Sequence, residues 1–314
     1  SAFLARLQFP TMIQAMAWLP WILWAARRVA AKPDVGRALG LALVIALAIL
    51  AAHPQMAYVA LILSIATALA HVYRKTAPRA YKLRVAVPIC ASVLLGSALS
   101  AAFWLPVLQT TAVSPRLNLS LGRASRFVLR PEHFITLIWP GYFGDPETGN
   151  YWAQGNMWEP ALYLGVPQLF LAVLGLLQRR RDTRVLYHAL LAGVCFWLAL
   201  GAQGGLYAVA YYAIPGMSAF HDPARFCVPA TLAIACLASI GFEHARRRLS
   251  VGTGAAIVVA SVALTLLWSS RLTPVISAKE LTYRARIAAI GSGHRVYSAM
   301  RQEHWDRYVS YADY

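Results

Sequence analysis

The sequence has few charged residues for its length. Of its 314 residues, 13% are charged and 59% are hydrophobic, whereas about a quarter of an ordinary soluble domain is charged. Acidic residues are the scarcest, with 12 Asp and Glu against 29 Lys and Arg. This deficit indicates that most of the chain faces a solvent that does not reward charge. We therefore predict an all-α integral membrane protein with about eight transmembrane helices.

Patterns that bind metals, nucleotides or nucleic acids are also missing. The four cysteines, Cys90, Cys195, Cys227 and Cys236, have no C-x-x-C spacing, and the histidines are scattered, so we predict no metal site. No P-loop, dinucleotide-binding glycine pattern or nucleophile elbow is present. The basic residues form short runs rather than a stripe with interleaved aromatics, so we expect no nucleic-acid partner. The sequence identifies no cofactor.

Several apolar stretches are long enough to cross a bilayer, whose hydrocarbon core of about 30 Å needs roughly 20 helical residues. The expected spans lie at about residues 9–26, 38–52, 56–72, 85–108, 160–177, 185–200, 227–242 and 252–268. They define a predicted polytopic transmembrane domain over residues 1–268. Residues 269–314 are expected to begin an extracytoplasmic region.

Lys and Arg alternate between the connectors of these spans. Sixteen of the 29 fall in four short connectors, whereas the turn at His53 has none and residues 201–226 hold only Arg225. Cytoplasmic loops carry an excess of Lys and Arg. We therefore expect a multi-pass membrane protein, with the His53 turn, the long outer loops 109–158 and 201–226 and both chain ends on the extracytoplasmic side.

Polar residues near the membrane are candidate ligand-binding groups, because hydrocarbon makes them costly. His53 and Gln55 lie at the turn between two spans, where either exposure to water or a role in an outer cavity fits. Arg225 lies at the outer end of a span, as an interfacial anchor or a ligand contact. The long outer loop holds four arginines that either pair with nearby acids or bind an anionic ligand. These are Arg116, Arg123, Arg126 and Arg130.

Four stretches of the sequence resemble the bacterial YfhO-like membrane proteins. In order, they are AAHPQMAYVAL, IWPGYFGDPETGNYW, WEPALYLGVPQLFLAVLGLL and IPGMSAFHDPARF, and the resemblance covers about residues 9–300. That family is similar to the GT-C class of glycosyltransferases, which take a sugar from a polyprenyl-phosphate donor on the outer face of the membrane. The resemblance thus implies a GT-C-like fold and a place in the bacterial cytoplasmic membrane.

The resemblance also implies a site and a reaction. His53 and Gln55 would line a central cavity, and Ser114, Arg116 and Arg225 would belong to its outer rim. A hydroxyl of a cell-envelope glycan or lipid acceptor would displace the lipid phosphate from the sugar, while arginines stabilise the departing phosphate. The acidic residue that the family implies has no match in this chain. It would lie upstream, so the catalytic residue is unknown.

Two other classes of function remain open. The same cavity fits a non-catalytic protein for lipid or polysaccharide translocation or assembly, and a structural membrane subunit is the third alternative. The chain starts without a methionine and ends in a polar, aromatic-rich stretch, so we interpret it as an internal piece of a longer protein. The sequence does not indicate the sugar, the acceptor, a metal requirement or the oligomeric state.

Overall fold

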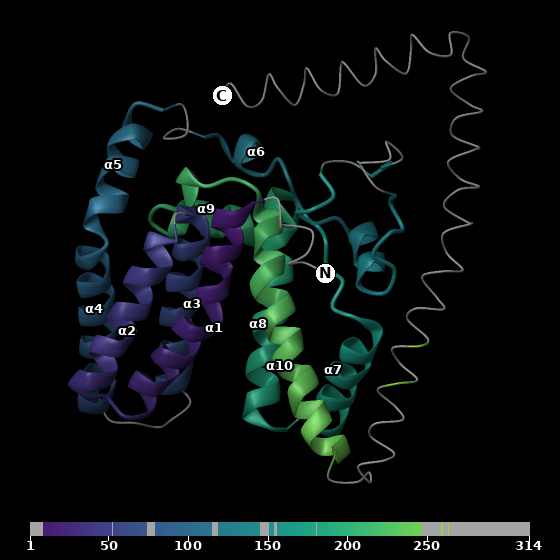
Figure 1. Cartoon of the computed structure of the whole chain (residues 1–314), viewed down its shortest axis with the longest axis horizontal. Helices are drawn as coiled ribbons and strands as arrows, with labels where there is room; N and C mark the ends of the chain where they lie inside the picture. The colour runs from purple at the N-terminus through teal and green to yellow at the C-terminus, as the bar shows by residue number, and fades with distance from the viewer. Residues whose placement is uncertain are drawn as a thin grey trace.

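The computed structural model describes residues 9–51, 53–73, 79–114, 119–144, 151–153, 156–179 and 181–246, together with Val259 and Ala263. These residues form helices and loops, and none of them forms a strand (Figure 1). The prediction of an all-α chain is confirmed for this part. Apart from those two isolated residues, the predicted span 252–268 and the region 269–314 lie outside the described residues.

Five helices form the first group. They are α1 (Pro10–Ala31), α2 (Val35–Leu50), α3 (Pro54–Tyr73), α4 (Arg79–Leu99) and α5 (Ala101–Ala112). Proline stands in the first turn of α1, where its missing N–H leaves no hydrogen bond unmade. The Asp34 carboxylate accepts a hydrogen bond of 2.9 Å from the backbone N–H of Arg37 and so caps α2. Helices α1 and α3 pack together, as do α2 and α4.

Three further long helices form the second group: α7 (Val166–Gln178), α8 (Thr183–Ala199) and α10 (Cys227–Arg246). Glycine allows α7 and α10 to approach closely. A Cβ atom added at Gly241 would lie 1.9 Å from the carbonyl oxygen of Leu171, and one at Gly175 would lie 2.7 Å from that of Leu237. Small residues at such crossings are typical of helices packed in membranes.

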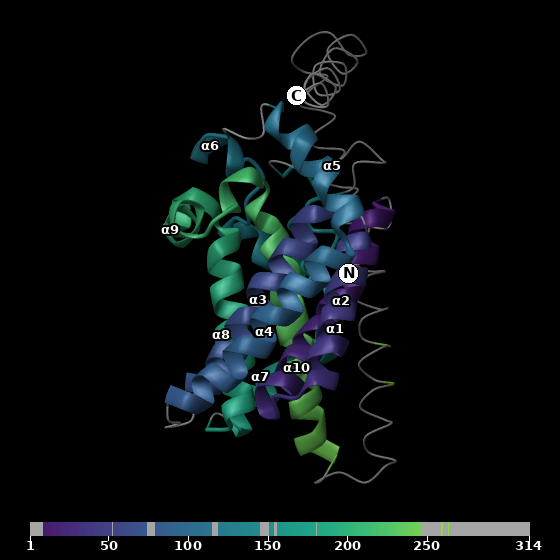
Figure 2. The ribbon, with the colours of Figure 1, turned by 90° about the vertical axis from the view of Figure 1, so that its left-hand side faces the viewer.

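The long helices alternate in direction, so their ends gather at the two ends of the bundle (Figures 1 and 2). At one end, called the basic end, α1, α3, α7 and α10 finish and α2, α4 and α8 begin. At the other, called the loop end, lie the turn at His53 and the short helices α6 (Leu121–Ala124) and α9 (Leu206–Ala213). The described parts of the two predicted outer loops, 109–158 and 201–226, thus lie at the same end of the bundle as the His53 turn.

The helices between these ends carry no strongly charged residues. Asp, Glu, Lys and Arg are absent from residues 10–26, 38–73, 85–114, 160–178, 185–221 and 226–242. Large apolar side chains are exposed on the outside of the helices, including Leu94 at 72% and Phe170 at 62%. Among the described residues, two helices are long and apolar enough to cross a membrane, Arg79–Leu99 and Pro223–Arg246.

Candidate functional site

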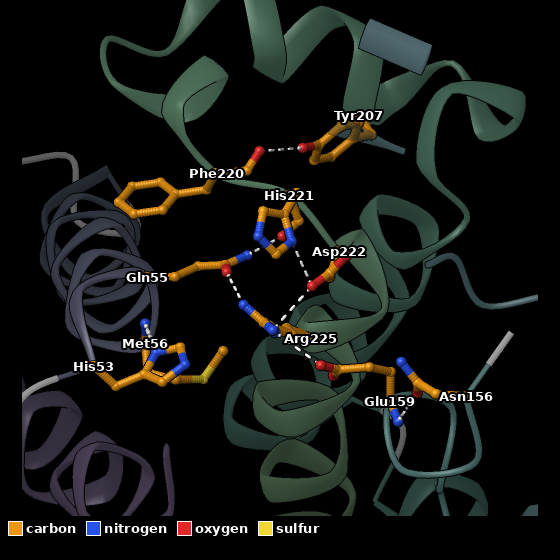
Figure 3. Close-up of polar contacts among 10 residues, drawn as sticks. All are labelled: His53, Gln55, Met56, Asn156, Glu159, Tyr207, Phe220, His221, Asp222 and Arg225. Atoms are coloured by element: carbon orange, nitrogen blue, oxygen red, sulfur yellow. Dashed lines mark hydrogen bonds and ion pairs between the residues drawn. The ribbon is translucent and has the colours of Figure 1, made fainter. Parts of the chain in front are cut away.

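Polar side chains from three distant segments meet at the loop end (Figure 3). We call this group the arginine cluster. It consists of Gln55, Glu159, His221, Asp222 and Arg225. Gln55 comes from the first turn of α3, Glu159 from the loop before α7, and the other three from the segment leading into α10. The cluster therefore ties the first group of helices to the second.

Arg225 is the centre of the cluster. Its Nε donates a hydrogen bond of 2.9 Å to Glu159 Oε1, its Nη2 lies 2.9 Å from Asp222 Oδ2, and its Nη1 donates to Gln55 Oε1. The side chains of Arg225, Glu159 and Asp222 are only 15%, 2% and 4% exposed. Charged groups this deeply buried are stable only when they are paired and hydrogen-bonded. One guanidinium thus neutralises two buried carboxylates only in part, because it carries one positive charge against two negative.

The backbone at Asp222 is unusual. Asp222 has φ 63° and ψ 70°, in the left-handed region that costs a non-glycine residue of order 1–3 kcal/mol. Its N–H donates to the carbonyl oxygen of Ala124 at 3.1 Å, and its own carbonyl accepts from Arg225 N–H at 3.0 Å. Among the described residues, the buried Oδ1 of Asp222 has no hydrogen-bond partner. The surrounding contacts therefore hold a strained residue with spare acceptor capacity inside the cluster.

His221 is oriented by its neighbours. Its Nδ1 lies 2.5 Å from Asp222 Oδ2, and its backbone carbonyl accepts a hydrogen bond of 2.5 Å from Gln55 Nε2. A carboxylate at Nδ1 favours the tautomer that carries the proton there, which leaves Nε2 as a proton acceptor. The ring is 30% exposed, so a ligand can reach it. This pair has the arrangement of a histidine prepared to act as a general base.

His53 lies beside the cluster at the start of α3. Its Nδ1 accepts a hydrogen bond of 3.3 Å from the backbone N–H of Met56. Burial, followed by the nearby positive charge of Arg225, lowers the pKa of His53 to about 4. His53 is therefore neutral at physiological pH and adds no positive charge to the site.

An arginine-containing stretch runs alongside the cluster. The N–H of Ala224 donates to the carbonyl oxygen of Phe127 at 3.1 Å. Together with the hydrogen bond from Asp222 N–H to Ala124, it joins this stretch to the segment that carries Arg225. Within the same stretch, Arg123 and Arg126 are exposed. The next arginine in the chain, Arg130, lies 3.9 Å from Glu132 in an exposed ion pair. The stretch that is hydrogen-bonded to the cluster segment thus also bears the exposed guanidinium groups of Arg123 and Arg126.

The structure brings together three of the five predicted site residues: His53, Gln55 and Arg225. Ser114 follows the end of α5, where its N–H donates to the carbonyl oxygen of Thr111 at 3.1 Å, and it does not belong to the cluster. Arg116 lies outside the described residues. Asp222 was not among the predicted site residues, although its place three residues before Arg225 was a signal. Nothing in the sequence indicated that Glu159 pairs with Arg225.

Comparison of the chain with protein-family models, with characterised proteins and with solved structures finds no match. Among the described residues, no group of three or more His, Cys, Asp and Glu side chains could hold a metal ion. The function is therefore inferred from the arginine cluster and its position at one end of an apolar helical bundle.

Proposed function

We propose that this chain is part of a polytopic membrane protein whose loop end faces the outside of the bacterial cytoplasmic membrane. The charge-free middle of the helices and their exposed apolar side chains support this placement, since a water-soluble protein rarely exposes such a continuous apolar surface. Arginine and lysine residues at the basic end support a cytoplasmic position for that end. Helices α1, α2, α3, α7 and α8 cross the bilayer together with α4 and α10, and the eighth span of the proposal is the one expected from the sequence at residues 252–268.

We further propose that the loop end is a GT-C-like glycosyltransferase site. It takes a sugar from a polyprenyl-phosphate donor and transfers it to a hydroxyl of a cell-envelope glycan or lipid. The observation that carries this proposal is the arginine cluster, with the His221–Asp222 pair at its edge and exposed arginines beside it. A cluster of this kind, next to an apolar band, suits a ligand with an anionic head and a long hydrocarbon tail.

The roles of the arginines follow from their surroundings. Arg225 is a positioning residue, because two carboxylates and Gln55 already occupy its guanidinium. Its formal charge, summed with those of Glu159 and Asp222, leaves the centre of the cluster at −1. A phosphate is therefore better held by the exposed Arg123 and Arg126, whose guanidinium groups bind phosphate oxygens in pairs. The rim arginine Arg116 belongs to the same proposal.

His221 is the proposed general base. The acceptor hydroxyl gives its proton to His221 Nε2 while its oxygen forms a bond to the anomeric carbon of the sugar. The bond between that carbon and the phosphate oxygen breaks, and polyprenyl phosphate leaves with the electron pair. Asp222 stabilises the imidazolium that forms, and the exposed arginines stabilise the charge on the leaving phosphate.

The test is sugar transfer in proteoliposomes. Purified protein is given polyprenyl-phosphate-linked radiolabelled hexoses, and new acid-labile glycosides are separated from the donor. His221→Gln is expected to lower kcat by about 10²–10⁴-fold without changing the melting temperature. His188→Gln, a half-buried histidine near the basic end whose Nδ1 lies 2.7 Å from the carbonyl oxygen of Arg184, is the matched control and should transfer normally.

Two outcomes would contradict this proposal in different ways. Normal transfer by His221→Gln would remove His221 as the base. Movement of the labelled donor across the bilayer without any new glycoside would favour the alternative function, lipid translocation without catalysis.

A further inference from the structure

An apolar groove runs between α2 and α4, starting at the basic end. Its volume is about 740 Å³, and the two helices that line it lie on the side of the bundle away from α7, α8 and α10 (Figure 1). The lining residues are Pro33, Asp34, Val35, Ala38, Leu39, Ala80, Leu83, Arg84, Val87, Pro88, Ala91, Ser92 and Leu95. Ser92 is hydrogen-bonded to the carbonyl oxygens of Ala38 and Pro88. Polar groups that are open to a ligand therefore occur only at the basic end of this lining.

The groove has the dimensions of a lipid chain. The α4 positions that line it recur every three to four residues from Ala80 to Leu95, so they share one face of the helix. At 1.5 Å per residue this face is about 22 Å long. One leaflet of a bilayer has a hydrocarbon depth of about 15 Å, half of the 30 Å core. An acyl chain that enters the membrane at the basic end can thus lie along the groove.

Positive charge is concentrated where the groove begins. Asp34 is occupied, because it caps α2 and lies 3.3 Å from Arg37 Nε. Arg84 lines the groove, is exposed, and has no ion-pair partner among the described residues. Arg79 is also exposed in the first turn of α4. Both helices begin at this end, so their dipoles add to the positive potential.

We propose that this groove binds an anionic glycerophospholipid of the cytoplasmic leaflet. One acyl chain lies against Leu83, Val87 and Leu95, and the lipid phosphate is held by Arg84. Basic pockets between helices at the cytoplasmic face are typical sites for anionic headgroups. The inference rests on the membrane placement in the proposed function and is independent of sugar transfer.

The experiment measures lipid retention by purified, delipidated protein in detergent, with phosphatidylglycerol and phosphatidylcholine as the two probes, by native mass spectrometry. We expect wild-type protein to bind phosphatidylglycerol more tightly. Arg84→Gln should weaken phosphatidylglycerol binding roughly fivefold, as expected for about 1 kcal/mol per basic residue near the headgroups, and leave phosphatidylcholine unchanged. Ala91→Trp, which fills the exposed groove, should weaken both. Arg181→Gln, an exposed arginine elsewhere at the basic end, is the matched control.

Several results would overturn the proposal. Equal binding of the two lipids would exclude an anionic headgroup site, and full binding by Ala91→Trp would exclude the groove itself. A dimer that Ala91→Trp dissociates, without bound lipid, would assign the groove to a second copy of the chain. Release of wild-type protein from membranes by alkaline carbonate would instead contradict the membrane placement, and absence of sugar transfer would leave the lipid result unaffected.

Discussion

Removal of Arg225 should destabilise the protein far more than the loss of an exposed arginine. In Arg225→Met, the carboxylates of Glu159 and Asp222 stay buried, at 2% and 4% exposure, and lose the cation that balances them. Breaking a buried ion pair from one side costs about 3–5 kcal/mol, because the remaining charge has no compensation. We expect a loss of at least this size, since two carboxylates are affected rather than one.

A triple variant separates charge burial from side-chain packing. Arg225→Met combined with Glu159→Gln and Asp222→Asn leaves no buried charge in the cluster. Neutral replacement of a whole buried ionic group is often close to neutral in stability. The triple variant should therefore be more stable than the single one, although it carries two additional substitutions.

The assay is the free energy of unfolding of purified protein in mixed micelles of mild detergent and dodecyl sulfate, followed by tryptophan fluorescence. Arg184→Met is the matched control, because Arg184 also contacts a carboxylate at 2.9 Å, but the two side chains are 48% and 18% exposed. Exposed pairs contribute only about 0–1 kcal/mol. Equal losses in Arg225→Met and Arg184→Met, or a triple variant less stable than the single, would refute the description of the cluster as a buried ionic centre.

Two further predictions concern the His53 turn and the α7–α10 contact. Because the pKa of His53 is lowered from 6.5 to about 4, only the unfolded chain binds its proton between these values, so stability falls as the pH drops from about 6.5 to about 4. His53→Gln should make this fall shallower in the same unfolding assay, and an identical slope would contradict the burial of His53. Gly241→Ala should cost about 1–3 kcal/mol by overpacking, since the added Cβ would lie 1.9 Å from the carbonyl oxygen of Leu171. Gly193→Ala, with nothing within 4 Å of the added atom, should be neutral or slightly stabilising; equal effects of the two substitutions would exclude the close approach of α7 and α10.

The positions of the helices could be predicted from hydropathy, but their bounds could not. The stretch predicted as one span at 85–108 is two helices, because α4 ends at Leu99 and α5 begins at Ala101. At this break the Ser100 hydroxyl donates to the carbonyl oxygen of Gly96 at 2.9 Å. The span predicted at 160–177 becomes helical only at Val166. The preceding Gly165 has φ 103°, a conformation outside the helical region, which hydropathy does not detect.

The candidate site was predictable only in part, for a similar reason. His53 and Gln55 stood out because a tight turn between apolar spans needs no polar residue. The partner of Arg225 three residues before it, Asp222, was within reach of sequence reasoning. Glu159 was not, since 66 residues separate it from Arg225 and only the packing of α7 against α10 brings them together. Pairing across such a distance is set by tertiary structure and leaves no local pattern.

Labelling of introduced cysteines determines on which side of the membrane the arginine cluster lies. In a background with the exposed Cys90 replaced by serine, Gln203→Cys places a thiol at the loop end and Arg181→Cys places one at the basic end, both at exposed positions. With a membrane-impermeant maleimide, we expect Gln203→Cys to react in intact cells and Arg181→Cys to react only in everted vesicles. The reverse pattern, or reaction of both in intact cells, would contradict an outward-facing cluster.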